Sequence, residues 1–221
     1  MSSSSLAVRL KLSVLDQSVA VSGRTQAEAI GHTLQLAQHC EALGYHRFWV
    51  SEHHSHPTLA GSAPEILMAA IAVTTQRIRT GSAGVLLPHH AALDQYRQLY
   101  RPSPRHPLPQ PVLCLWALAA DTEAEAWHHF SSRERWKINR NTGALGSLLS
   151  PEEVAQRPNT PVQQAQSDAM RRTALVGTGA QVAARLQALA DTLNVAEISV
   201  ITWTHDPAAA RRSYELCWRK N

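Results

Sequence analysis

Short apolar runs alternate with longer amphipathic segments over most of the chain. The apolar runs read as strands buried on both faces of a parallel sheet, and they lie at 10–15, 48–50, 78–87, 112–119 and 197–203. The amphipathic segments read as helices, and they lie between these runs, at 162–175 and 180–193, and after residue 206. Strand and helix therefore alternate through short connections, which indicates right-handed βαβ units and an α/β fold with about five strands.

Helix starts are marked by residues that can satisfy free backbone N–H groups. A Ser or Thr followed three residues later by Glu is the capping-box pattern, and it occurs at Thr25 with Glu28, Ser62 with Glu65, and Thr122 with Glu125. Gly44 predicts the end of the first helix, because glycine adopts the left-handed conformation of a helix C-cap. Asp206 followed by Pro207 predicts the start of the last helix.

Two stretches depart from this alternation. Residues 139–161 are rich in Asn, Gly, Ser and Pro and predict an irregular excursion from the sheet. The sequence GTG at 177–179 predicts a turn between two helices. Its glycines at a helix start could form a weak anion site or a simple helix cap, and the cap is favoured.

Composition narrows the class of protein. With 221 residues, 44% apolar and 17% charged, the chain suits one globular domain over 1–221. The net charge of +4 is spread along the chain rather than gathered into a stripe, so nucleic-acid binding is not favoured. The start, MSSSSLAVRLKLSVLD, is too short and too charged for a signal peptide or membrane span, so we expect a cytoplasmic protein with no membrane partner. The three distant cysteines predict reduced, buried thiols.

Candidate chemistry gathers where the predicted strands end. The run FWVSEHHSHP, residues 48–57, places Glu52, His53, His54 and His56 directly after an apolar strand. These histidines, with His89 and His90 after the third run, could be ligands of a metal ion. The later strands offer no Asp, Glu or His residues that would complete a recognisable ligand set, so no metal is expected. Asp16, at the end of the first run, could face a substrate or cap a turn.

Two tryptophans lie within predicted strands. Trp116 and Trp203 could wall a pocket or belong to the core, and the core is the commoner place for a strand aromatic.

Several segments of the sequence together resemble a known family. They are LSVLDQS, ALGYHRFWVSEHH through LAGSAPEILMAAIA, IRTGSAGVLLPHH, LAADTEAEA and VGTGAQVAARL. They resemble the bacterial luciferase-like, flavin-dependent monooxygenases, whose fold is an eight-stranded (β/α) barrel. The resemblance touches most of the chain, and residues 44–88 carry it most specifically.

The resemblance implies a flavin enzyme. It implies reduced FMN at the carboxyl ends of the strands, supplied by a separate flavin reductase or taken from solution, and oxidation of a small organic substrate by O2. Carried over by position, His53 is the catalytic residue and Glu52 a flavin-site residue, while Ala83 and Gly84 lie against the isoalloxazine ring. Asp16 and His54 are the residues expected to contact substrate.

The chain also departs from the family pattern. After Pro88 it runs almost at once into DQYRQLYRPS, which resembles the helix before the family's seventh strand, so an internal deletion near residues 90–95 is expected to remove three strands and the phosphate-binding turns. Five strands cannot close a barrel built for eight, so we expect an incomplete or rearranged TIM-type barrel.

The missing strands leave open questions about function. No GxGxxG or Walker loop replaces the phosphate-binding turns. Open edges of the sheet could be covered by a second copy in a homo-oligomer. The alternative to a monooxygenase is a non-catalytic remnant or interaction module that does not bind flavin.

Overall fold

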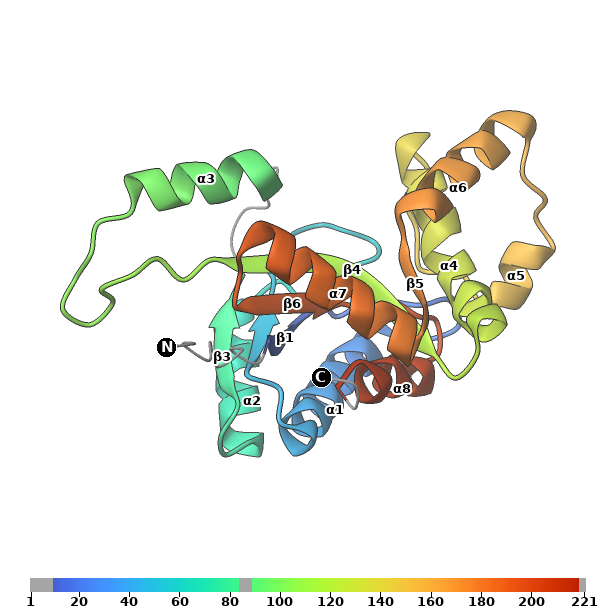
Figure 1. The fold of residues 1–221 in the computed structure, drawn as a ribbon. Coiled ribbons are helices and arrows are strands. Elements are labelled where there is room, and N and C mark those ends of the chain that lie inside the picture. The colour runs from blue at the N-terminus through green and yellow to red at the C-terminus, as the bar shows by residue number, and fades with distance from the viewer. Residues whose placement is uncertain (1–9, 84–88, 219–221) are drawn as a thin grey trace.

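Six parallel strands form one open sheet in the computed structural model, which describes residues 10–83 and 89–218 (Figure 1). The strand order is β3-β2-β1-β6-β4-β5, so β3 and β5 are the two edges. The bounds are β1 Lys11–Asp16, β2 Arg47–Val50, β3 Arg79–Ser82, β4 Val112–Ala120, β5 Leu175–Thr178 and β6 Glu197–Ile201. The expected fold class, an α/β fold with a barrel-derived parallel sheet that does not close, is confirmed.

Helices alternate with these strands. Their bounds are α1 Gln26–Leu43, α2 Pro64–Thr74, α3 His89–Leu99, α4 Glu123–Asn141, α5 Pro151–Ala155, α6 Pro161–Thr173, α7 Gly179–Leu193 and α8 Pro207–Trp218. Helix α4 packs against α5, α6 and β5, and these four elements form a lobe at one end of the sheet, whereas α3 projects from the opposite side (Figure 1).

The main core lies between the sheet and helices α1, α7 and α8. Leu12 and Val14 of β1 have no solvent exposure, and neither do Ile198 and Val200 of β6. A second cluster covers the opposite face of the strands and includes Leu15, Ile201 and Trp203. A strand with both faces covered needs apolar residues at successive positions, which explains the unbroken apolar runs in the sequence.

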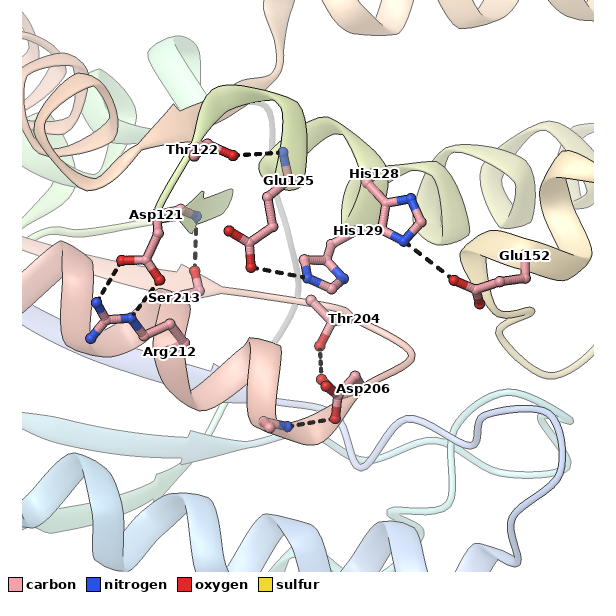
Figure 2. A network of polar contacts seen from close by, with 12 residues as sticks. Asp121, Thr122, Glu125, His128, His129, Glu152, Thr204, Asp206, Arg212 and Ser213 are labelled. Carbon is pink, nitrogen blue, oxygen red and sulfur yellow. Dashed lines mark hydrogen bonds and ion pairs between the residues drawn. The ribbon is translucent and has the colours of Figure 1, made fainter.

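Most expected helix caps are present. Thr25 and Glu28 form a complete capping box, and Gly44 ends α1 with φ +90°. Figure 2 shows Thr122 accepting a hydrogen bond from the backbone N–H of Glu125 at 3.2 Å. Asp206 Oδ1 accepts from the backbone N–H of Ala208, which caps α8 as expected.

The capping box expected at Ser62 and Glu65 is wrong. Helix α2 begins one residue later than that spacing requires, after Ala63, and no side chain caps it. Pro64 in the first turn has no N–H to satisfy, which reduces the need for a cap.

The short strand β5 was not expected. Residues 162–175 were read as a helix and 177–179 as a turn, whereas α6 ends at Thr173 and Leu175 already begins a strand. Four residues ending in Gly177 and Thr178 give too little apolar pattern to indicate a strand. Thr178 then forms a capping box with Gln181 at the start of α7, so the cap interpretation of this turn is confirmed.

Two other segments differ in extent from the expectation. The third strand, expected over 78–87, is observed at Arg79–Ser82, and residues 84–88 lie outside the described part. The excursion at 139–161 contains the short helix α5. The excursion is fastened to the loop after β1, because Leu148 N donates to Ala20 O at 3.0 Å and Ser22 N donates to Leu148 O at 2.8 Å.

Helix α8 is attached to the end of β4 by polar side chains (Figure 2). Arg212 binds both carboxylate oxygens of Asp121, at 3.0 Å and 2.5 Å. The next residue, Ser213, is fully buried, and its hydroxyl accepts the backbone N–H of Ala119 at 2.9 Å. These contacts fix the carboxyl end of β4 against the last helix.

Candidate functional site

The carboxyl ends of β1, β2 and β3 lie side by side at the C-terminal edge of the sheet. This edge runs across the strand ends, unlike the lateral edges formed by β3 and β5. The strands are parallel and in register, with Asp16 opposite Val50 and Val50 opposite Ser82. The residues that follow these positions therefore come together, although they are about 35 residues apart in the sequence. This is the edge at which (β/α) folds place their chemistry.

His53 is the residue of this edge with the best-defined surroundings. Its backbone N–H donates to Gly61 O at 2.9 Å, and its ring Nε2 lies 3.2 Å from the amide nitrogen of Gln17. An amide nitrogen can only donate, so Nε2 accepts and the ring proton is assigned to Nδ1. Partial burial lowers the pKa of His53, and the neighbouring His56 and His54 lower it further. His53 is therefore neutral at pH 7, with one acceptor and one donor.

Asp16 caps the turn that follows β1. Its Oδ2 accepts hydrogen bonds from the backbone N–H of Ser18 at 3.0 Å and from the hydroxyl of Thr33 at 2.5 Å. Burial raises the pKa of this carboxyl, and the two hydrogen bonds oppose that rise. Asp16 also lines a small cavity of about 60 Å³ with His32 and Thr204.

Glu52 and His54 lie farther out than His53. His54 Nε2 lies within hydrogen-bonding distance of Glu52 Oε1, at 2.7 Å, and more than half of each side chain is exposed. An exposed pair of this kind is weakly held, because solvent screens the charges. The structure therefore separates these two residues from the partly buried Gln17–His53 contact, although all of them follow the same two strands.

Ala83 is the only residue after β3 that the structure describes before the gap at 84–88. Its backbone N–H donates to Val50 O at 2.8 Å, which holds this residue against β2. Ala83 also packs against the second apolar cluster. Gly84, the other residue expected there, lies outside the described residues.

Two buried polar atoms at this edge have no hydrogen-bond partner among the residues that the structure describes. They are Oε1 of Gln17 and Oγ of Ser51. Buried polar atoms in proteins nearly always have a hydrogen-bond partner. Two such atoms without a partner, at the ends of adjacent strands, mark a place where a ligand or water would bind. Gln17 and Ser51 were not singled out from the sequence, because glutamine and serine after a strand carry no distinctive pattern.

A row of aromatic rings runs from this edge across the sheet. Ring centroids are 6.1 Å apart for His53 and His56, 6.4 Å for His56 and Trp136, 4.8 Å for Trp136 and Trp203, and 4.6 Å for Trp203 and Trp116. Trp116 and Trp203 belong to the second apolar cluster, and both also line a cavity. Trp136 comes from α4, and nothing in the sequence of that helix linked it to the histidine segment.

Among the residues whose side chains the structure describes, 10–83 and 93–218, no group of three or more His, Cys, Asp or Glu is arranged to hold a metal ion. The side chains of His89 and His90 lie outside this range. No helix in the described part of the chain is both long and apolar enough to cross a membrane. Cys40, Cys114 and Cys217 form no disulfide with one another, and Cys40 and Cys217 are buried.

The first part of the chain is similar in sequence to known proteins. Residues 10–98 match the family model described as luciferase-like monooxygenase. Over 91 residues the chain is 46% identical to an N-acetyl-S-alkylcysteine monooxygenase of Bacillus subtilis, a match that covers 41% of this chain and 27% of that protein. It is 38% identical over 84 residues to a luciferase-like monooxygenase of Escherichia coli, covering 38% of this chain and 25% of the relative. The matched part thus spans about a quarter of each of these relatives.

Solved structures resemble the whole fold. A crystal structure of apo-MsnO8 aligns with 96% of this chain and 98% of its own, with a TM-score of 0.84 and 22% identity. The oxygenating constituent of 3,6-diketocamphane monooxygenase from Pseudomonas putida, solved in complex with FMN, aligns with 96% of this chain and 97% of its own, with a TM-score of 0.60 and 13% identity. At these identities the likeness concerns the fold alone.

Proposed function

We propose that this chain, whose residues 10–98 match the luciferase-like monooxygenase family model, is a flavin-dependent monooxygenase that uses reduced FMN and O2 to oxidise a small organic molecule. The observation that carries the proposal is the contact between Gln17 and His53, 3.2 Å apart at the ends of two adjacent strands. This contact places a neutral histidine beside the unpaired atoms of Gln17 and Ser51.

The residues of this edge fit the polar rim of a flavin ring. An isoalloxazine carries alternating donors and acceptors along one edge, and Gln17 Oε1 and Ser51 Oγ are buried groups that need such partners. Ala83 presents a small side chain where a flat ring would lie, and with Gly84 it is the proposed platform. Glu52, with more than half of its side chain exposed, would contact the cofactor from the rim.

When bound, reduced FMN supplies the two electrons that activate O2. The chain's own contribution is to position the ring and to manage a proton. Nε2 of His53 is held by Gln17, so Nδ1 carries the proton and points it away from that contact. In this proposal His53 is the catalytic residue, because its Nδ1–H, on the side of the ring away from Gln17, can donate a hydrogen bond to the reacting oxygen. Asp16 and His54 are proposed to line the substrate side of the same edge.

A flavin titration tests the proposal. Adding FMN to the purified protein should quench flavin fluorescence with a saturable dependence, and anaerobic addition of reduced FMN followed by O2 should give substrate-dependent turnover. His53→Ala should lose turnover while keeping flavin binding within a few fold. His128→Ala, on the exposed face of α4, is the matched control and should retain both. An unchanged fluorescence at high FMN concentration would refute the proposal.

The supply of reduced flavin and the location of the protein belong to the same proposal. A separate flavin reductase is the proposed source of reduced FMN, and the cytoplasm is the proposed compartment. The addition of a purified reductase with NADH should therefore replace chemically reduced FMN in the turnover assay.

A second candidate function rests on the open sheet. With β3 and β5 as edges, the sheet has backbone groups that a second chain could pair with. The chain would then be a single domain with an internal deletion near residues 90–95, which keeps the sheet as a scaffold for interaction and binds no flavin. This candidate predicts a homo-oligomer by light scattering and no response to FMN, whereas a monomer that binds FMN would exclude it.

A further inference from the structure

A second cavity, of about 200 Å³, lies between the end of β4, strands β5 and β6, and helices α4 and α6. Its walls are largely apolar and include Trp116, Trp203, Phe130 and Met170. None of Asp16, Gln17 and His53 lines it, so it is separate from the strand-end site. Sites for drug-sized ligands occupy about 300–1,000 Å³, and this cavity would therefore admit a smaller molecule.

Arg133 brings a positive charge to this cavity without a matching negative charge. Its guanidinium lies 3.8 Å from the centroid of the Trp116 ring, and its Nε is buried with no hydrogen-bond partner. Burial lowers the pKa of Arg133 to about 10, with a further contribution from Arg140, so the group remains charged at pH 7. Lys137 lines the same cavity and adds a second cation.

The acidic residue beside Arg133 in the sequence is already engaged. Glu134 accepts hydrogen bonds from Arg171 Nε at 2.7 Å, from Arg171 Nη2 at 2.8 Å and from the Ser167 hydroxyl at 2.7 Å. Among the residues that the structure describes, no acidic side chain forms an ion pair with Arg133. A partly buried cation without a counter-ion loses hydration that nothing in the described chain replaces, so an anion is expected from outside the chain.

Trp203 also lines this cavity. It is 4% exposed, and its indole Nε1 is buried with no hydrogen-bond partner among the described residues. An indole N–H can only donate. Two residues that line the cavity, Arg133 and Trp203, therefore each carry a buried N–H without a partner in the described part of the chain.

We propose that this cavity binds a small monocarboxylate with an apolar body. Stacking on Trp116 occupies one face of the Arg133 guanidinium but leaves its edge, which matches the two oxygens of a carboxylate. The Trp203 N–H would donate to the same group, and Phe130 and Met170 would contact the apolar body. The site does not depend on flavin and would be occupied whether or not the strand-end site binds FMN.

Calorimetric titration with benzoate, in the absence of flavin, tests this site. We expect saturable binding of benzoate to the full chain and at least tenfold weaker binding of benzamide, which has the same ring but no charge. Arg133→Met should weaken benzoate binding at least tenfold. Arg185→Met removes an exposed arginine of α7 and is the matched control for net charge, with binding expected within twofold of the parent protein.

A second variant covers the case in which Arg133→Met does not fold. Trp203→Phe keeps an aromatic wall and removes the N–H, and it should weaken benzoate binding about fivefold. Circular dichroism and thermal melting establish that each variant is folded before it is titrated. The proposal is overturned if benzoate does not bind, if benzamide binds equally well, or if folded Arg133→Met or folded Trp203→Phe retains the parent affinity.

Discussion

The indole N–H of Trp136 donates a hydrogen bond to the hydroxyl of Thr58, with 2.9 Å between nitrogen and oxygen. Thr58 is fully buried and in turn donates to the carbonyl of Gly146 at 2.5 Å. Helix α4, the histidine segment after β2 and the excursion after α4 therefore meet at one hydroxyl group. The lobe at the end of the sheet is thereby tied to the strand-end site.

The loss of this hydrogen bond should destabilise the protein. Trp136→Phe removes the N–H and part of a half-buried ring that packs on Trp203, and we expect the free energy of unfolding to fall by about 1–3 kcal/mol. Trp127→Phe is the matched control, because the Trp127 N–H reaches only the exposed Glu123 at 3.4 Å. Its effect should stay below about 1 kcal/mol. Guanidinium unfolding of both variants makes the comparison, and equal losses would contradict the role of Thr58.

Replacement of Asp16 should change stability in a pH-dependent way. Burial raises the pKa of Asp16 in the folded state above its ordinary value near 3.8. The folded protein then holds this proton more tightly than the unfolded chain, so stability falls as pH rises through the folded pKa. Asp16→Asn mimics the protonated group, and its stability relative to the parent protein should be higher at pH 7 than at pH 4. Urea unfolding at both pH values measures this, and a constant difference would count against a raised pKa.

The Gln17–His53 contact should control the protonation of the histidine. Gln17→Glu would place a carboxylate about 3 Å from Nε2 and favour the imidazolium, so the pKa of His53 should rise. Gln38→Glu, which adds the same charge on the exposed face of α1, should leave it unchanged. An NMR titration of the histidine ring resonances reports the pKa directly. A pKa of His53 that is equal in the parent protein and in Gln17→Glu would show that the two side chains do not meet in solution.

Two glycines of one helix should respond in opposite directions to alanine. Gly44 ends α1 at φ +90°, and an added Cβ would lie 2.9 Å from the Trp218 ring, so Gly44→Ala should cost about 1–3 kcal/mol. Gly31 lies inside α1, and an added Cβ would meet no atom within 4 Å, so Gly31→Ala should stabilise by up to about 1 kcal/mol. Thermal or chemical unfolding separates the two, and a loss at both positions would contradict this description of α1.

The alternation of apolar runs and amphipathic segments was sufficient to predict a parallel α/β sheet. It worked because β1, β2, β4 and β6 are covered on both faces and so need continuous apolar residues. It failed at β5, where only Leu175 and Val176 precede Gly177 and Thr178, and at the start of α2, where Pro64 takes the place of a side-chain cap. Short edge elements depend on tertiary pairing, which leaves little trace in local sequence.

The site was predictable in part. Asp16 and His53 could be predicted as candidate site residues because both lie at the end of a predicted strand. The structure brings the ends of these two strands together. Position alone did not distinguish the partly buried Gln17–His53 contact from the exposed Glu52–His54 pair, because both follow the same strands. Trp136 and Arg133 lie on α4, far in the sequence from Thr58, Trp116 and Trp203, so only the fold reveals their contacts with these residues. The roles proposed for Glu52, Ala83, Asp16 and His54 remain predictions.

Strand β1 lies between β2, which follows it by about 30 residues, and β6, which begins at Glu197. A ribosome would therefore release the first strand long before the strand that covers its other side has been made. Until then the backbone groups on that side of Lys11–Val14 have no partner within the sheet. The sheet can therefore be completed only after residues 197–201 have left the ribosome, and a product stalled before them keeps the unpaired backbone edge of β1 exposed.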